Sequence, residues 1–309
     1  MKKYLLIAAS LFFASNCFAQ DVLPKLPNGP KIKQDAFENY QWQKDSADKD
    51  TNAMVSYYKA QDYKNALIKA KALSEKNDKN ATALVGYIYE MGLGLEAPDY
   101  ILAVSNYRNA IKLGSIDAMI GLGRIASIGQ GDIPLLEAND ALETAIAAKR
   151  SDAVMPMADF LIRSGSDKMR GFAFYQGLSD AGDIDAAYKA AVLLDDGDIL
   201  PPDDPIMAQK YLMKSATGGN HQAEADLGLY FYLGKAGIKN QIEAASWFKK
   251  AAEGGDKQGA FYWALVNAKG EGVKADLQTA IKYSQIAKDE VPQAQRLYDQ
   301  LQKYIVTQK

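Results

Sequence analysis

The side chain most often used for catalysis at neutral pH occurs once in this sequence, as His221 in GGNHQAEA. A zinc site built on it would need further histidine or cysteine ligands, and the one cysteine, Cys17, lies in the first twenty residues. A general base needs a nucleophile within hydrogen-bond reach, which a sequence alone cannot show. We therefore interpret His221 as a polar turn residue before a helix, and expect no metal and no cofactor.

Acidic residues gather in DDGDILPPDDP, residues 195–205, which hold Asp195, Asp196, Asp198, Asp203 and Asp204. Carboxylate oxygens are the ligands that a divalent cation prefers, but the spacing of an EF-hand loop is missing. We interpret the stretch as a solvated loop, with a cation site as the alternative.

Two short glycine pairs, Gly92-Leu93-Gly94 and Gly270-Glu271-Gly272, could suggest a phosphate-binding loop. Such a loop requires a preceding strand or a fuller glycine–lysine pattern. Helical patterns precede both pairs here, so the sequence does not predict nucleotide binding. Since no catalytic constellation emerges, we predict that the protein is not an enzyme.

The first nineteen residues have the form of a secretory signal peptide. Lys2 and Lys3 precede an apolar stretch from Tyr4 to Ala14, which at 11 residues is too short to span a membrane. Small residues at Cys17 and Ala19 predict cleavage before Gln20. The sequence therefore predicts a periplasmic protein with no integral membrane segment after cleavage; a lipid anchor on Cys17 is the alternative.

The charge balance does not favour nucleic acid as a partner. The chain has 36 basic and 38 acidic residues, and removal of Lys2 and Lys3 would leave 34 against 38, or −4. A nucleic-acid surface is normally strongly basic. We therefore expect a protein or peptide partner and no nucleic acid; the sequence leaves the oligomeric state open.

The elements that position these residues repeat along the chain. The pattern apolar–small–x–x–apolar–x–x–Gly occurs six times, with some substitutions. The last positions of successive copies are 37, 35, 33, 37 and 36 residues apart. The six copies begin at Val85, Leu122, Met157, Ala190, Leu227 and Trp263. After each copy comes a second pattern, small–x₃–apolar–x₂–small–x₃–Gly, which begins at Ala103, Ala138, Gly171, Ala208, Ala244 and Ala280.

Offsets of three, four and seven residues place the patterned positions on one helical face. Each repeat is therefore expected to be two helices, helix A and then helix B, and the fold class is all-α. Glycine after helix B can adopt positive φ and end the helix. Trp247 and Trp263 fall at patterned positions and are interpreted as packing residues, whereas Trp42 precedes the repeats.

These patterns resemble the Sel1-like repeats, a branch of the tetratricopeptide superfamily. The fifth repeat matches best, from AEADLGLYFYLGKAG to AASWFKKAAEGGD, and GEGV at 270–273 and GLGL at 92–95 match the family's loop. The resemblance covers about residues 81–294. It implies a right-handed superhelical solenoid of antiparallel helix pairs that acts as an adaptor.

The remaining residues complete the domain plan. We expect a signal peptide at 1–19, an extended proline-containing linker at 20–45, a tetratricopeptide-like unit at 46–80, six Sel1-like repeats at 81–294 and a capping helix at 295–309. A cap is expected because the end of a repeat array otherwise exposes an apolar face.

Helix A should line the concave side of such an array. Positions two after its apolar slot, together with neighbours, are predicted to point away from the core and form a binding groove: Tyr87, Glu90, Arg124, Asp159, Leu229, Tyr232 and Leu265. Mixed charge and apolar groups of this kind suit a peptide or protein segment.

The sequence thus predicts a periplasmic interaction scaffold in a cell-envelope process, for example placement or regulation of a secretion system such as type VI. Two alternatives are a protein that binds peptidoglycan or polysaccharide and a Sel1-type β-lactamase or penicillin binder. The resemblance implies that Sel1-like proteins described as β-lactamases or penicillin binders carry paired cysteines that join their repeats. The predicted mature chain has no cysteine, which disfavours this alternative.

Overall fold

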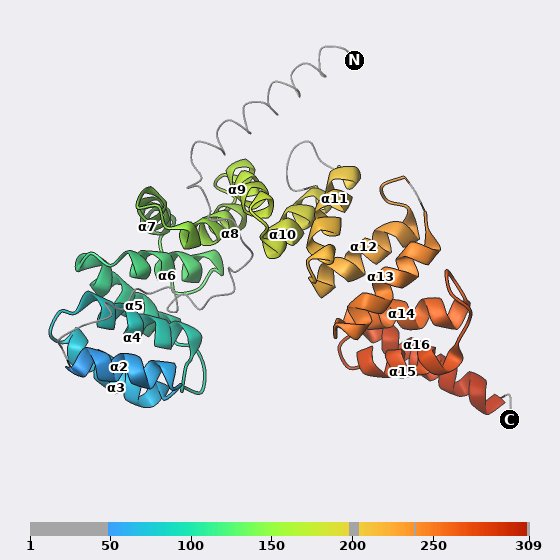
Figure 1. The fold of residues 1–309 in the computed structure, drawn as a ribbon, viewed down its shortest axis with the longest axis horizontal. Helices are drawn as coiled ribbons and strands as arrows, with labels where there is room; N and C mark the ends of the chain where they lie inside the picture. Colours follow the sequence, from blue (N-terminus) through green and yellow to red (C-terminus); the bar gives the residue numbers. More distant parts are fainter. Residues whose placement is uncertain (1–48, 198–203, 238, 308–309) are drawn as a thin grey trace, which may run out of the picture. The chain divides into compact units, whose positions relative to one another are not determined.

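The computed structural model describes residues 49–197, 204–237 and 239–307, and all regular elements in these ranges are helices (Figure 1). Contacts divide the chain into two compact units, Met1–Ala181 and Gly182–Lys309, called unit 1 and unit 2 below. The predicted signal peptide, linker and Trp42 lie outside the described residues.

Unit 1 consists of helices that pack mainly on their neighbours in the chain. They are α2 Lys49–Lys59, α3 Tyr63–Ser74, α4 Lys79–Met91, α5 Tyr100–Lys112, α6 Ile116–Ser127, α7 Leu135–Ala147, the 3₁₀ turn η1 Ser151–Ala153, α8 Val154–Ser164 and α9 Lys168–Asp180.

Unit 2 continues the alternation of helices A and B. Its helices are α10 Ile184–Asp195, α11 Pro205–Thr217, α12 His221–Leu233, α13 Gln241–Glu253, α14 Lys257–Lys269, α15 Leu277–Ala287 and α16 Pro292–Thr307. Each predicted repeat thus contains its two helices, and the all-α fold of stacked helix pairs is confirmed within each unit.

The structure differs from the predicted boundaries in two places. The last helix, α16, begins at Pro292 rather than at residue 295, since proline suits the first turn of a helix. The boundary between the units falls at Ala181 and Gly182, inside the run of six predicted repeats. Nothing in the repeat pattern predicted this boundary, because helix patterns continue through it.

Small residues allow large side chains to lie between neighbouring helices. The ring of Tyr107 on α5 is 1% exposed and fills the space beside Gly86 on α4 and Gly121 on α6. A Cβ atom on Gly86 would lie 2.6 Å from the Tyr107 ring, and one on Gly121 would lie 2.3 Å from it. In unit 2, Phe248 occupies the corresponding space beside Gly228. The helix A glycines are therefore packing residues.

The turn after helix B uses a left-handed residue in each unit. Gly114, Gly182, Gly219 and Gly255 have φ between +84° and +99°, as the second sequence pattern predicts. In the second repeat the same position is Lys149, with φ +62°. The turn geometry is kept there although the glycine is lost, so a residue with a Cβ adopts a backbone conformation that favours glycine.

Lys149→Gly is expected to raise the free energy of unfolding of unit 1 by about 0.5–1 kcal/mol. The left-handed conformation costs a residue with a Cβ about 1–2 kcal/mol, and the extra backbone freedom of glycine when unfolded returns about 0.5–1 kcal/mol of that. The reverse change, Gly114→Lys, meets no atom within 4 Å of the new Cβ and should destabilise by a similar amount. Thermal unfolding measures the change in stability of each variant relative to the parent. A lower melting temperature for Lys149→Gly than for the parent would contradict the prediction.

The two described tryptophans occupy helix-packing positions. Trp247 is 7% exposed, with the Lys250 ammonium 3.9 Å from the ring centroid. Trp263 is partly buried and packs against the apolar clusters of α13 to α16. Their predicted packing role is confirmed.

Candidate functional site

The predicted groove residues lie on the A helices of both units, but the structure does not expose them as the sequence analysis expected. Tyr87 is 6% exposed and Glu90 is 8% exposed. Their expected orientation toward solvent is therefore wrong, because α4 packs against α3, α5 and α6 together. The remaining predicted groove residues are partly buried: Arg124, Asp159, Leu229, Tyr232 and Leu265. Whether any of the set binds a partner stays a prediction.

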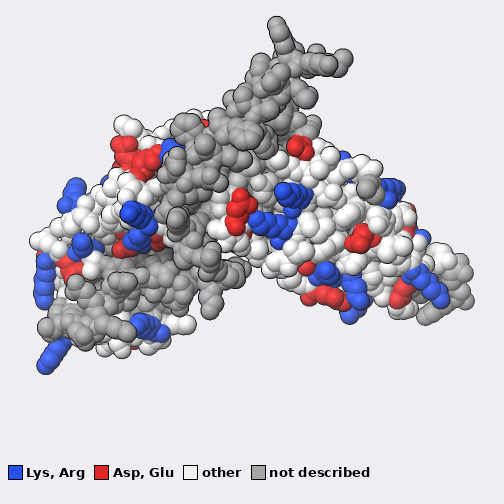
Figure 2. All heavy atoms as spheres, turned by 45° about the horizontal axis from the view of Figure 1, so that its top comes forward, with Lys and Arg blue, Asp and Glu red and all other residues white. Residues whose placement is uncertain are grey.

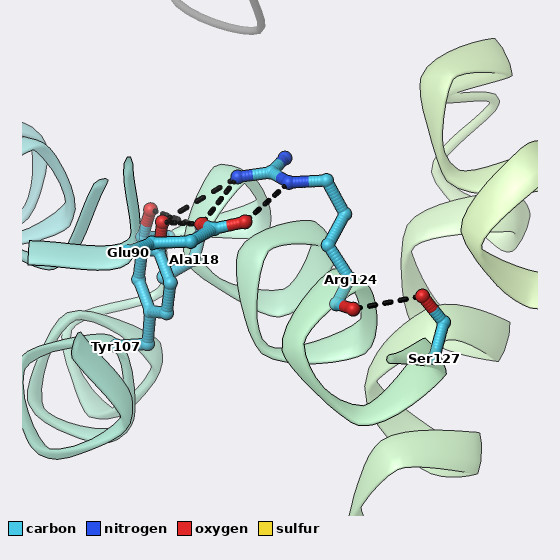
Figure 3. Close-up of polar contacts among 6 residues, drawn as sticks. Glu90, Tyr107, Ala118, Arg124 and Ser127 are labelled. Carbon is cyan, nitrogen blue, oxygen red and sulfur yellow. Dashed lines mark hydrogen bonds and ion pairs between the residues drawn. The ribbon is translucent and has the colours of Figure 1, made fainter. Parts of the chain in front are cut away.

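Glu90 and Arg124 form one buried polar network with Tyr107 (Figure 3). The guanidinium of Arg124 donates to both carboxylate oxygens of Glu90, from Nε at 2.8 Å and from Nη2 at 2.7 Å. The Tyr107 hydroxyl donates to Glu90 Oε2 at 2.5 Å. Three helices, α4, α5 and α6, are thus joined by a single carboxylate.

The electrostatics of this network keep Arg124 charged and Tyr107 neutral. Burial raises the pKa of Tyr107 well above its usual value, and the nearby Glu90 carboxylate raises it further. Burial alone would lower the pKa of Arg124, but Glu90 and Tyr107 together raise it above its usual value. Arg124 also lies over the ring of Tyr87, with its Cζ 5.6 Å from the centroid. The arrangement is a connection between adjacent repeats, with its charges satisfied internally.

A similar tyrosine–carboxylate pair occurs two repeats further along unit 1. The Tyr175 hydroxyl on α9 donates to Asp159 Oδ1 on α8 at 2.5 Å. Burial, and then the Asp159 charge, raise the pKa of Tyr175. Asp159 therefore helps to join helices A and B of its repeat, in addition to its predicted place in the groove.

In unit 2 two such pairs link α10 and α12 reciprocally. The Tyr188 hydroxyl on α10 donates to Asp226 Oδ2 on α12 at 2.9 Å. Tyr230 on α12 donates to Asp195 Oδ1 on α10 at 2.5 Å, and Lys235 pairs with the same carboxylate at 2.9 Å. These contacts between consecutive A helices explain why aspartates occur on a partly buried helix face.

The last three predicted groove residues lie on α12 and α14. Tyr232 donates from its hydroxyl to Glu271 Oε2 at 2.6 Å, and the Lys239 ammonium lies 5.5 Å from its ring centroid. Leu229 packs against the apolar cluster around Phe248. Leu265 is partly buried on α14. Tyr232 thus links α12 to the loop that follows α14.

Asp226→Asn is expected to flatten the acid part of the pH–stability profile and to raise stability at pH 7. Burial raises the pKa of Asp226 above its usual value, so the folded state binds the proton more tightly than the unfolded state. Stability is then lost as pH rises from the ordinary carboxyl value, about 3.9, through the raised pKa. Asparagine can still accept from Tyr188 and carries no charge. Urea unfolding between pH 4 and pH 7 measures the slope.

Asp276→Asn is the control with the opposite sign. Side-chain and backbone hydrogen bonds from Thr279 lower the pKa of Asp276, so its stabilisation is present above the ordinary value and lost as pH falls. Removing its charge should weaken the rise of stability with pH. Equal slope changes in both variants would contradict the assignment.

The residues first considered for chemistry have structural partners. His221 begins α12, and its Nδ1 lies 2.8 Å from Glu224 Oε2. Asp204 accepts from the Met207 backbone N–H at 2.9 Å and caps α11. Asp198 and Asp203 lie outside the described residues. Among the residues that are described, no three His, Cys, Asp or Glu side chains gather as a metal site.

A feature that the two sequence patterns did not reveal lies at the start of five of the six B helices in the predicted repeats. The second residue of five B helices is an exposed aliphatic side chain, 49–73% accessible. We call this set the aliphatic row: Ile101, Leu136 and Met169 in unit 1, and Ile206 and Ile242 in unit 2. The spacings 35, 33, 37 and 36 match the repeat, so they were visible in the sequence, but the two patterns considered there covered only buried positions.

The charged residues on the face seen in Figure 2 are interspersed by sign. Lysine and arginine alternate with aspartate and glutamate among uncharged surface, on the described residues of each unit. None of the described helices combines the length and the apolar character that a membrane span needs.

Comparison with known proteins places this fold in a family. Four segments match the model of the Sel1 repeat: 80–115, 184–220, 221–256 and 257–290. The chain contains four Sel1 repeats. The pairs α6–α7 and α8–α9 fall outside the matched segments but have the same helix–turn–helix organisation. Sel1 repeat proteins are typically non-enzymatic scaffolds for protein–protein interaction.

Two solved structures resemble the chain over most of its length. A Sel1 repeat protein from Oxalobacter formigenes is 26% identical, with a TM-score of 0.60, over 78% of this chain and 99% of that one. The antigen c5321 of uropathogenic Escherichia coli, which displays an SLR fold, is 23% identical, with a TM-score of 0.56, over 76% of this chain. The match spans 51% of that antigen's length. No curated protein matches the sequence.

Proposed function

We propose that this Sel1 repeat protein is a periplasmic, non-enzymatic scaffold that binds a protein partner in a cell-envelope process. Placement or regulation of a secretion system such as type VI is one such process. The signal-peptide form of residues 1–19 supports the compartment. Protein binding is supported by what Sel1 repeats generally do.

The aliphatic row is the observation that supports protein binding most directly. Large aliphatic side chains exposed by 66% at Ile101, 72% at Leu136 and 70% at Ile206 gain free energy when a partner removes them from water. Isolated exposed aliphatic residues are common on protein surfaces, but here they recur at one register of the repeat. Because the row always occupies the second position of helix B, a partner can make the same contact with successive repeats of each unit.

Fractionation tests the compartment. Osmotic shock should release the protein from cells, and its intact mass should correspond to a chain that begins at Gln20. Retention in the cytoplasm with residues 1–19 attached would overturn the periplasmic assignment. A membrane-bound form with an acylated N-terminal Cys17 would support the lipid-anchored alternative.

Photo-crosslinking tests the scaffold role in intact cells. A photoreactive amino acid at Ile206 or Ile242 is expected to give a discrete adduct with one protein, identified by mass spectrometry. The matched control is Lys249, which is exposed on α13 but lies outside the aliphatic row. The proposal fails if both row positions give no adduct, or only the adducts that Lys249 gives.

A further inference from the structure

A cavity in unit 1 lies between α6, α7 and α8, which are neighbours in the fold (Figure 1). Its volume is about 280 Å³, and its walls include Gly129, Asp132, Ile133, Leu135, Phe160 and Arg163. We call it the Arg163 cavity. Sites for small molecules usually measure about 300–1,000 Å³, so this cavity suits one or two amino-acid side chains.

Arg163 differs from the other arginines of unit 1 in its pairing. Each of the others pairs with a carboxylate: Arg108 with Glu137, Arg124 with Glu90, Arg150 with Asp117 and Asp152, and Arg170 with Glu143. In the described part of the chain Arg163 has no such pair. Because a guanidinium keeps its charge at any physiological pH, the cavity presents a cation that a ligand can reach.

The exposed side chain of Arg163 places its guanidinium directly over Gly129. Gly129 has φ +69°, and a Cβ built on it would lie 2.0 Å from Arg163 Nη2 and 2.5 Å from Cζ. The guanidinium therefore occupies the space that a side chain at position 129 would need.

Apolar side chains line the same cavity as the guanidinium. Phe160, one turn earlier on α8, is 3% exposed and forms a buried wall. Leu135, which also lines the cavity, is 59% exposed, and its neighbour Leu136 is 72% exposed. A ligand that covers these leucines gains the free energy of apolar burial in addition to the ion pair.

We propose that the Arg163 cavity binds a segment of a partner protein that presents a carboxylate beside an aliphatic side chain. The carboxylate accepts two hydrogen bonds from the guanidinium of Arg163, and the aliphatic side chain packs on Leu135 and Phe160. This site rests on the protein-binding role proposed above. Asp132 also lines the cavity and repels an incoming carboxylate, so neutralising Asp132 strengthens binding.

A phage-displayed library of random dodecapeptides provides the first test. Peptides are selected on the immobilised mature chain, with counter-selection on the Arg163→Glu variant. The expected result is enrichment of sequences with aspartate or glutamate within two positions of leucine, isoleucine or valine. Enriched peptides without an acidic residue, or no enrichment over the counter-selection, overturn the proposal.

Fluorescence polarisation with one enriched peptide then measures the contribution of each group. Arg163→Ala weakens binding by about tenfold or more, the loss of one charge-assisted interaction. The affinity of Arg163→Lys lies between those of the wild type and Arg163→Ala, because an ammonium cannot donate two parallel hydrogen bonds as a planar guanidinium does. Asp132→Asn binds more tightly. Arg296→Ala, an exposed arginine on α16, is the control and leaves the affinity unchanged. Equal affinities of the wild type and Arg163→Ala, with unaltered melting temperatures, overturn the site.

Crosslinking in cells separates this site from the general scaffold role. The Arg163→Glu variant with the photoreactive amino acid at Ile101 should lose the adduct that the parent gives there. If the adduct persists, the Arg163 site is wrong and the scaffold role stands. If the parent also gives no adduct at Ile206 and Ile242, the scaffold role itself fails.

Discussion

Arg124→Ala is expected to lower the free energy of unfolding of unit 1 by about 3–5 kcal/mol, because it leaves a buried carboxylate without its cation. Glu90 is 8% exposed, and its two oxygens accept from Arg124 Nε and Nη2. Without Arg124, the Tyr107 hydroxyl is the remaining partner of that carboxylate among the contacts described here. Hydrogen exchange followed by mass spectrometry, on peptides from α4 and α6, measures the change within unit 1.

Arg108→Ala is the matched control. Arg108 donates to Glu137 from the same two nitrogens, each at 2.8 Å, so the pairs have the same geometry. The Arg108 and Glu137 side chains are 41% and 33% exposed, against 26% and 8% for Arg124 and Glu90. Water replaces a lost partner at an exposed site, and we expect a loss of about 0–1 kcal/mol. Equal losses in the two variants would show that burial does not decide the effect.

Glu90→Gln should rescue part of the loss when it is combined with Arg124→Ala. The neutral amide still offers an oxygen to the Tyr107 hydroxyl, and no unpaired charge remains buried. A double variant no more stable than Arg124→Ala alone would mean that the cost comes from lost packing of the arginine stem and not from the charge.

The repeat patterns predicted the helices well, and the reason is local. Offsets of three, four and seven residues fix the buried face of a single helix, and the alanines at Ala103, Ala208 and Ala244 are all fully buried. The left-handed turn at Lys149 was not predicted, because this copy of the pattern lacks the glycine; the structure shows that the position keeps its geometry.

The buried network could not be predicted in the same way. A single helix pattern shows which face of α4 is apolar but not that neighbouring helices cover its other faces, so Tyr87 and Glu90 were expected at the surface. Glu90 and Arg124 stand 34 residues apart on successive A helices. Opposite charges one repeat apart are a detectable feature, but whether they meet depends on how the two helices stack.

The aliphatic row was missed for a different reason. A pattern that looks for buried positions ignores an apolar residue that falls just outside it, as Ile101 and Ile242 do at the starts of their helices. Their 66% and 73% exposure appears only when neighbouring repeats are in place. Surface function is therefore the part of such a sequence that needs the structure.

Gly272→Ala is expected to lower the free energy of unfolding of unit 2 by about 2–5 kcal/mol. Gly272 has φ +75°, which costs a residue with a Cβ about 1–2 kcal/mol. The new Cβ would also lie 2.0 Å from the carbonyl oxygen of Gln241, the first residue of α13. Because that atom belongs to the backbone, the loop must move away, and overpacking of this kind costs about 1–3 kcal/mol.

Gly237→Ala separates the two contributions. Gly237 has φ +95° and no atom within 4 Å of a built Cβ, so only the backbone term applies. We expect a loss of about 1–2 kcal/mol. Urea unfolding of the two variants, compared with the parent, gives the difference that belongs to the contact with α13.

If Gly272→Ala loses much more unfolding free energy than Gly237→Ala, close packing explains why position 272 of the Gly270-Glu271-Gly272 pair is a glycine. Gly94 has the same relation to its preceding B helix, since a Cβ there would lie 3.1 Å from Tyr63, the first residue of α3. In Gly272 the neighbouring atom is a carbonyl oxygen, which would repel a phosphate. Equal losses in Gly272→Ala and Gly237→Ala would instead mean that the loop moves freely, and the close approach to α13 would not be a constraint on the repeat.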